Sequence, residues 1–412
     1  MPDPNSQTVK LYREDPLLET FTATVLEVRE LGDDGFGIIL DRTAFYPEAG
    51  GQPADEGQLG EAEVFDVQEE DGVIVHFADR ALREGSDVEG SLDWQRRRDF
   101  MQQHSGQHLL SAVVLDEFSA VTRGFHLGEE ESTIDLSVEL SDEDLSHTQS
   151  RINNLVDLNL SISTRFGGRD DPAVKAARKP PPPGIEEVRL VDIEGVDSVP
   201  CGGTHLPSTS MIGGIHILAG GTGRAHGFFR LSFICGGRLR RRLSSLDRIS
   251  AELSVKLTTS PESFAERFED MEEQIKDLKR EITDLRKALI PLRVSALLEG
   301  AEKVGSARIV MTRIDDLSPE SLPILVSALT AHTDVIALVG AEVSGTGRII
   351  FARGEDFDID MGAILGEAAT MLGGGGGGSS VHATGGGPNG EALDTVLFDS
   401  LTRVRTLLKG EE

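Results

Sequence analysis

The first 90 residues alternate between hydrophobic and polar positions in short segments, which glycines and acidic residues separate. A period of two is typical of β-strands with one buried face. The alternation predicts strands at 21–28, 35–40 and 72–77. Because short strands joined by turns favour a small barrel or a sandwich, we expect a β-barrel-like domain over residues 1–90.

From residue 91 to about 237 the periodicity is mixed. Hydrophobic residues after His108, beginning with Leu109 and Leu110, form an apolar stripe at helical spacing. The other expected elements are a helix near 141–159, a stiff proline-rich connector at 179–184, and strands at 188–193, 213–218 and 227–234. This mixture predicts an α+β core over residues 91–237.

The next segment carries apolar residues at alternating spacings of four and three. They are Phe264, Phe268, Met271, Ile275, Leu278, Ile282, Leu285 and Leu289. Such a heptad seam predicts a long helix, which Ser260 and Pro261 start and Pro291 ends or kinks. Because residues 239–257 are also amphipathic, the region 238–300 fits either an antiparallel hairpin within the chain or a coiled coil between chains.

The last part, 301–412, reads as a separate small α/β domain. The expected elements are strands at 307–314, 334–341 and 349–351, and helices near 318–331, 361–371 and 391–408. A glycine-rich run at 373–387 lies between the last two helices. It is either a flexible linker or a glycine-lined surface for RNA or another domain, and no Gly-Lys-Ser/Thr follows to make it a Walker loop. The whole chain is therefore predicted to be α+β.

Charge changes this picture little. Seventy acidic and 40 basic residues give a net charge of −30, which argues against a polyanionic partner. However, 31 of the basic residues are arginine and 9 are lysine, and a lysine-poor acidic surface suits a high-salt cytoplasm, where salt screens attraction to phosphate. The arginine clusters at 96–98 and 238–242 are either solvated helix faces or a rim that faces phosphates.

The compartment follows from what the sequence lacks. Two cysteines exclude a fold built on disulfides. The start of the chain has neither a basic nor an apolar signal region, and no apolar run approaches 18 residues. We expect a soluble cytoplasmic protein without a membrane partner.

Two short motifs carry the most specific chemistry. His104 and His108 are four residues apart on a predicted helix and so share a face. Cys201 and His205 repeat this spacing around two glycines, which favour a tight turn. Three imidazoles and one thiolate suit Zn²⁺, a borderline-soft ion. The other cysteine, Cys235, follows an apolar run and is expected to be a buried hydrophobic residue.

Three segments, in this order, resemble the alanyl-tRNA editing proteins, free-standing relatives of the editing domain of alanyl-tRNA synthetase. They are the run 45–53, the helix of His104 and His108, and the run 200–205. The helical region and the glycine-rich end are similar to the parts that follow this domain in the synthetase. Two places depart from the family. Ala49 stands at a position that is commonly glycine, and residues 379–382 stand where a run like Arg-Pro-Asp-Met is more usual. The resemblance also implies that no aminoacylation module precedes residue 1.

The resemblance implies a reaction in trans at a zinc site. It is hydrolysis of the aminoacyl ester of tRNA(Ala) that is mischarged with serine, and also with glycine. Thr43, by its place in the motif, is expected to recognise the serine hydroxyl that alanine lacks. The alternative is a β-branched residue that fills a strand. Gln52 is expected to contact the substrate, and the backbone N–H groups of Gly202 and Gly203 to approach it.

Several alternatives stay open. Four protein ligands fill a tetrahedral site, whereas a catalytic metal needs an open position. The metal would therefore expand its coordination or release a ligand during the reaction, or it would only hold the substrate. The chain also fits a non-catalytic tRNA-binding protein with a structural zinc, or an enzyme that edits Ser-tRNA(Thr). A phosphoesterase is disfavoured because no Asp-His-His triplet occurs. A homodimer through the helical region or the C-terminal domain fits the pattern as well.

Overall fold

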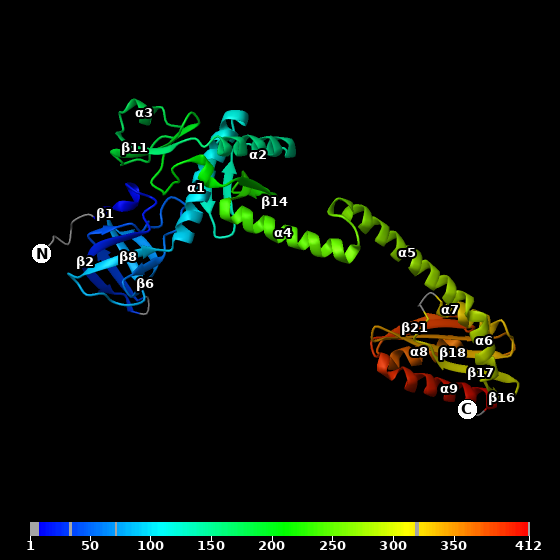
Figure 1. Cartoon of the computed structure of the whole chain (residues 1–412). Helices are drawn as coiled ribbons and strands as arrows, with labels where there is room; N and C mark the ends of the chain where they lie inside the picture. The colour runs from blue at the N-terminus through cyan, green and yellow to red at the C-terminus, as the bar shows by residue number, and fades with distance from the viewer. Residues whose placement is uncertain (1–7, 33–34, 71, 318–320, 411–412) are drawn as a thin grey trace. The chain divides into compact units, whose positions relative to one another are not determined.

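The computed structural model describes residues 8–32, 35–70, 72–317 and 321–410. It divides into two compact units, Met1–Leu253 and Ser254–Glu412, and Figure 1 labels several elements of each. The expected division at 90, 237 and 300 is finer than this and stays a prediction. Helices and strands both contribute throughout, so the chain is α+β. Within the described ranges, no helix combines the length and apolarity needed to cross a bilayer.

The first unit begins with a closed antiparallel barrel. Its strands, in barrel order, are β2 (Thr20–Glu30), β3 (Phe36–Leu40), β7 (Val73–Ala78), β6 (Ala62–Glu70), β5 (Gly57–Leu59) and β8 (Asp87–Leu92). Val25, Ile38 and Val64 are buried in its core, and along β6 buried and exposed residues alternate around Val64. Outside it, β1 (Val9–Lys10) pairs in parallel with β4 (Arg42–Thr43), and η1 (Leu11–Arg13) follows β1.

Helix α1 (Trp94–Phe118) leads from the barrel into the second half of this unit. Asp93 caps it by accepting the Arg96 N–H at 3.0 Å. The hydrophobic residues after His108 pack in the core as expected, and the buried surface of α1 extends all around the helix between Phe100 and Val114. Gly106 permits this packing: a Cβ there would overlap Sγ of Cys235, which is fully buried as predicted.

Two sheets and shorter helices surround α1. One sheet has the order β14 (Ile215–Ala225), β15 (Phe228–Cys235), β10 (Ser132–Leu136), β9 (Thr122–Leu127), and the other β11 (Ile162–Gly168), β12 (Glu187–Ile193), β13 (Asp197–Pro200). The remaining elements are α2 (Asp142–Asp157), α3 (Pro172–Lys175) and η3 (Thr209–Ile212). Ser141 and Asp144 form a capping box that fixes the start of α2. Leu110, Ile134 and Leu231 belong to the core that joins these layers.

A run of helices follows β15. It comprises α4 (Gly236–Leu257), η4 (Pro261–Ser263), α5 (Phe264–Ala288) and α6 (Ile290–Glu299). Pro291 lies in the first turn of α6, where a missing N–H is tolerated, so it separates the two helices rather than kinking one. Residues of the heptad seam remain exposed, with 56% of Leu278 and 57% of Leu285 accessible. A hairpin and a coiled coil therefore both stay predictions.

The second unit contains one sheet with helices on both faces. Its strand order is β16 (Glu302–Val304), β17 (Ala307–Arg313), β18 (Val335–Val343), β19 (Thr346–Arg353), β21 (His382–Gly387) and β20 (Gly375–Gly378). The helices are α7 (Leu322–Thr330), α8 (Met361–Met371) and α9 (Leu393–Lys409), with η5 (Gly390–Ala392). Helices α8 and α9 pack with Leu338 on one face, whereas α6 and α7 pack with Val339 on the other. Residues 318–320 of the expected helix near 318–331 lie outside the described residues.

The glycine-rich run is not a flexible linker. It forms the antiparallel hairpin of β20 and β21 at one edge of this sheet. A Cβ at Gly385 would lie 2.8 Å from the Leu365 side chain of α8 and 2.9 Å from Gly376 Cα. The glycines thus let a helix lie close above the hairpin. A role in binding RNA or another domain stays a prediction.

Candidate metal centre

Four side chains predicted to share a metal ion converge in the first unit. His104 and His108 lie on α1, and Cys201 and His205 lie on the loop after β13. The potential ligand atoms of all four residues lie within 4.8 Å of one another. Residues about a hundred positions apart in the sequence therefore form one cluster that could hold a metal ion.

Hydrogen bonds orient two of the imidazoles. The Nδ1–H of His104 donates to Gln52 Oε1 at 2.8 Å, and Nδ1 of His205 lies 3.3 Å from Ser105 Oγ. The Nε2 atoms of these rings therefore face Cys201 Sγ, at 3.4 and 3.3 Å. Polar groups that hold the outer nitrogen of a ligand imidazole are a usual feature of metal sites.

Burial sets the protonation of the cluster. Desolvation lowers the pKa of His104 to about 3, and it lowers the pKa values of His108 and His205 well below the usual value. Burial also raises the pKa of the Cys201 thiol. Neutral imidazoles are ready to coordinate a cation, and a bound cation would favour the thiolate.

The donor set fits a divalent ion of the zinc type. Imidazole nitrogen and thiolate sulfur are both ligand types that tetrahedral Zn²⁺ prefers in proteins, and four of them complete a tetrahedron. Nδ1 of His108 supports this fit, because it is buried and has no hydrogen-bond partner among the described residues. A buried polar atom without a partner is unfavourable, and an ion or its ligand sphere would relieve this cost.

Gly203 is required for the close approach of the loop to α1. A Cβ at this position would overlap the His104 ring and lie 2.8 Å from Gln52 Oε1. Its N–H donates to Cys201 Sγ at 3.4 Å. At the exposed Gly202, by contrast, a Cβ would meet no atom within 4 Å. The two glycines therefore have different roles, and only Gly202 keeps an N–H without a described partner at the surface.

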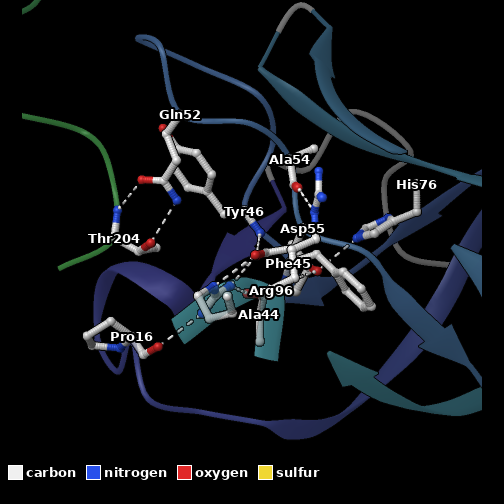
Figure 2. A network of polar contacts seen from close by, with 12 residues as sticks. Pro16, Ala44, Phe45, Tyr46, Gln52, Ala54, Asp55, His76, Arg96 and Thr204 are labelled. Carbon is white, nitrogen blue, oxygen red and sulfur yellow. Dashed lines mark hydrogen bonds and ion pairs between the residues drawn. The ribbon is translucent and has the colours of Figure 1, made fainter. Parts of the chain in front are cut away.

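Gln52 links the barrel to the metal cluster, and Figure 2 shows its two contacts with Thr204. Its Oε1 accepts from His104 and from the Thr204 N–H, and its Nε2 donates to Thr204 Oγ1 at 2.8 Å. Only 1% of Gln52 is exposed. The side chain that sequence reasoning assigned to substrate contact thus holds a histidine of the cluster and the loop of Cys201 and His205.

Thr43 takes part in a separate buried network with His76. Nδ1–H of His76 donates to the Ile38 carbonyl at 2.9 Å, and burial lowers the pKa of His76 to about 4. Its Nε2 therefore accepts from the Thr43 hydroxyl at 2.8 Å, while Thr43 Oγ1 accepts the Phe45 N–H. Thr43 has no exposed surface. The hydrogen of the Thr43 hydroxyl is therefore engaged, and one lone pair of its oxygen remains free to accept a hydrogen bond.

An ion pair anchors the loop that carries Gln52 (Figure 2). Arg97 and Asp55 are both buried, and Arg97 Nε donates to both carboxylate oxygens of Asp55 at 3.0 Å. Arg97 also donates to the carbonyls of Pro16 and Ala44. Arg97 is therefore neither on a solvated helix face nor on a rim that faces phosphates. The same is true of Arg238 in the second arginine cluster, which is 5% exposed and paired with Asp99.

Comparison with known proteins shows the family of this chain. An alanyl-tRNA editing protein AlaX-L from Pyrococcus horikoshii is 30% identical over 414 residues, which cover 97% of this chain and 99% of that protein. The chain belongs to the alanyl-tRNA editing protein family. This confirms the resemblance found in the sequence.

Other relatives place the family in a wider group. The alanyl-tRNA editing protein Aarsd1 of Danio rerio is 33% identical over 58% of each chain. An alanine–tRNA ligase of Natronomonas pharaonis is 33% identical over 98% of this chain but only 44% of the ligase. The chain thus spans less than half the length of that ligase.

Family models match three parts of this editing-protein chain. They are tRNA synthetases class II (A) at residues 8–96, the threonyl and alanyl tRNA synthetase second additional domain at 188–232, and the DHHA1 domain at 306–404. The first includes Gln52, and the second includes Cys201 and His205. One matched segment therefore precedes α1 in the chain and contains Gln52, and another follows it and contains two of the four cluster residues.

Sequence reasoning missed three residues that support the cluster. Ser105 and Thr204 lie beside ligands within the two motifs, and no signal sets them apart. Arg189 did carry one, because a charged residue interrupts the apolar strand β12. Its Nη1 donates to the carbonyls of Cys201 and Gly203 at 2.9 Å.

Proposed function

We propose that this protein hydrolyses the ester of tRNA(Ala) mischarged with serine, acting in trans in the cytoplasm, and that glycyl esters are also substrates. The convergence of His104, His108, Cys201 and His205 carries the proposal. Membership of the alanyl-tRNA editing family, shown by a relative matched over nearly its whole length, supports the substrate class.

Zn²⁺ is the proposed ion, held by the three imidazoles and the Cys201 sulfur. When bound, it supplies Lewis-acid chemistry for attack of water on an ester. The chain itself orients the ligands, through Gln52 at His104 and Ser105 at His205. The exposed N–H of Gly202 is a suitable donor for the oxygen on which charge develops during attack.

Thr43 is our proposed discriminator between serine and alanine. Because its own hydrogen is committed to His76, it can only accept from a ligand. A serine hydroxyl would satisfy that lone pair, whereas alanine offers no donor. Since Thr43 is fully buried here, contact requires residues above it to move.

A deacylation assay tests the proposal. We expect the zinc-loaded protein to hydrolyse Ser-tRNA(Ala) about 10- to 100-fold faster than Ala-tRNA(Ala), because a buried polar group that alanine leaves unpaired costs about 1–3 kcal/mol. Cys201→Ala should abolish hydrolysis, whereas Cys235→Ala, which removes the other thiol, should keep it. Equal indifference of the wild-type protein to both esters would refute the proposal.

The burial of the cluster favours a second candidate function. His104, His108 and His205 are at most 4% exposed, as in a closed structural site. In that case the protein would bind tRNA without hydrolysing it. Chelation would then reduce folding and RNA binding together, with no deacylation at any zinc concentration. Activity on Ser-tRNA(Thr) instead of Ser-tRNA(Ala) would indicate the related threonine system.

We also propose a homodimer through the exposed heptad seam of α5. Leu278 and Leu285 expose apolar surface that a second copy would cover. Leu278→Asp should convert a dimer to a monomer in sedimentation experiments, and a wild-type monomer would contradict this part of the proposal.

A further inference from the structure

Arg189 on β12 is a buried cation that has no anionic partner in the described part of the chain. Only 7% of it is exposed, and its side-chain hydrogen bonds go to two backbone carbonyls. Arg97 and Arg238 are buried too, but each of them pairs with a carboxylate. Because a buried charge without a counter-charge is unfavourable for folding, a residue of this kind commonly serves a functional site.

Arg189 holds Cys201 through both its backbone and its side chain. The Arg189 carbonyl accepts the Cys201 N–H at 3.1 Å, which extends the pairing of β12 with β13 by one residue. Nη1 of the guanidinium donates to the carbonyls of Cys201 and Gly203, both at 2.9 Å. Three bonds from one residue therefore fix a stretch that contains two glycines, which by themselves leave the backbone free to adopt many conformations.

The guanidinium determines which way the peptide between Cys201 and Gly202 faces. In a trans peptide the C=O and the N–H point in opposite directions, and the described residues contain no cis peptide bond. Since the Cys201 carbonyl points at Nη1 of Arg189, the N–H of Gly202 points away from the guanidinium. Gly202 is exposed, and its N–H has no partner among the described residues, so this donor is free for a ligand.

A second peptide of the loop has the same geometry. The Gly203 carbonyl also points at Nη1, and the N–H of Thr204 in that peptide donates to Gln52 Oε1 at 3.1 Å. Gln52 in turn accepts from His104 of the cluster. Arg189 thus orients two N–H groups of the loop, of which one is bound beside the cluster and the other is free at the surface.

We propose that Arg189 is a positioning residue for ester hydrolysis, which keeps the Gly202 N–H directed at the oxygen on which negative charge develops. The inference rests on the proposed function, because it concerns a donor of the same site. A reversal of this peptide would present the Cys201 carbonyl in place of the N–H, and its oxygen would repel that charge. Since the N–H acts mainly in the transition state, loss of Arg189 should lower kcat more than it raises KM.

Steady-state kinetics on Ser-tRNA(Ala) test the proposal. Arg189→Met removes the donors but keeps an unbranched side chain, and it should reduce kcat about 100-fold, as the loss of one oxyanion donor does, with KM changed by less than about twofold. Arg189→Lys, which keeps one donor group, should recover part of the rate. The control Arg165→Met removes an exposed arginine of the adjacent strand β11 and should behave as wild type. An unchanged kcat in Arg189→Met would overturn the proposal.

A backbone substitution identifies the group through which Arg189 acts. Replacement of Gly202 by glycolic acid exchanges its N–H for an ester oxygen and should reduce kcat by a similar factor. Because two changes that remove the same interaction are not additive, Arg189→Met should then cause a further loss of at most about threefold. If the two losses multiply, Arg189 does not act through the Gly202 N–H.

Metal binding separates this positioning role from support of the cluster. The bond from the Cys201 N–H to the backbone of residue 189 persists in every variant, so Arg189→Met should keep one zinc ion per chain. In cobalt-substituted protein, the absorption from sulfur to the metal should be the same in the wild type and the variant. Loss of metal, or a changed spectrum, in parallel with kcat would mean that Arg189 only supports the cluster.

Failure of the two proposals is distinguishable. If the wild type hydrolyses no aminoacyl-tRNA, the proposed function fails. Hydrogen exchange of the Thr204 N–H still tests the action of Arg189 on the loop, because this measurement requires no turnover. Arg189→Met should raise that exchange rate about tenfold, and an unchanged rate would show that the guanidinium does not hold the loop.

Discussion

Gln52 accepts a hydrogen bond from Nδ1–H of His104 at 2.8 Å, although the two residues belong to a barrel loop and to helix α1. The bond selects the tautomer of His104 whose Nε2 faces Cys201. A loop of the barrel therefore takes part in ordering the metal cluster, and the two halves of the first unit act as one site.

Removing this amide should weaken metal binding. Gln52→Ala leaves both the His104 Nδ1–H and the Thr204 N–H without an acceptor. Loss of such a supporting group typically costs about 10- to 100-fold in metal affinity. Zinc affinity measured by chelator competition should fall by that factor, whereas the exposed Gln58→Ala should change nothing. An unaltered affinity in Gln52→Ala would show that other contacts orient His104.

The two loop glycines should respond differently to alanine. At Gly203 a Cβ overlaps the His104 ring, while at Gly202 it enters open space. We expect Gly203→Ala to destabilise the first unit by about 1–3 kcal/mol and to lower zinc stoichiometry. Gly202→Ala should bind one zinc per chain like the wild type. Metal analysis after gel filtration and the unfolding temperature check both; similar behaviour of the two variants would contradict the observed packing.

The ion pair of Asp55 and Arg97 should be important for stability. Asp55→Ala leaves a buried guanidinium without its counter-charge, which commonly costs about 3–5 kcal/mol. The single tryptophan, Trp94, lies one turn before Arg97 and reports unfolding of this unit in denaturant. Asp170→Ala, which removes an exposed pair with Lys175, is the matched control and should leave the midpoint unchanged. If the denaturant midpoint of Asp55→Ala equals that of the wild type, the ion pair contributes little to stability.

His76 should make stability depend on pH. Burial lowers its pKa to about 4 in the folded state, whereas the unfolded chain keeps a value near 6.5. Between these values the unfolded state binds more protons, so stability falls as the pH decreases from about 6.5 to 4. This residue alone should contribute a loss of about 3 kcal/mol over that range. Comparison with His76→Gln isolates it from the other histidines. If both proteins lose stability in parallel, His76 is not the source.

Some features followed directly from residue order. Hydrophobic periodicity located β2, α2 and α8 to within two residues of their observed ends, because local alternation or helical spacing determines which face is buried. The ligand types were also local information. Histidine and cysteine at i and i+4 point to soft-metal chemistry wherever they lie, and the cluster of all four residues agrees with that prediction.

Other features depended on contacts between distant segments. The sequence left a barrel and a sandwich open, and the closing pairs of β8 with β2 and with β5 involve residues that are far apart in the chain. The glycine run was indistinguishable from a linker until its pairing across β20 and β21 was known. Arg97 looked like a surface arginine because nothing local reveals Asp55 beside it.

The sequence by itself therefore determined the family, the α+β class and the four candidate ligands, since these depend on residue type and short-range spacing. The tertiary structure decided that Gln52 holds a histidine, that the Thr43 hydroxyl can only accept, and that Arg97 is buried against Asp55. Such properties depend on which donors and acceptors remain unsatisfied after packing, and that balance is fixed only when distant segments meet.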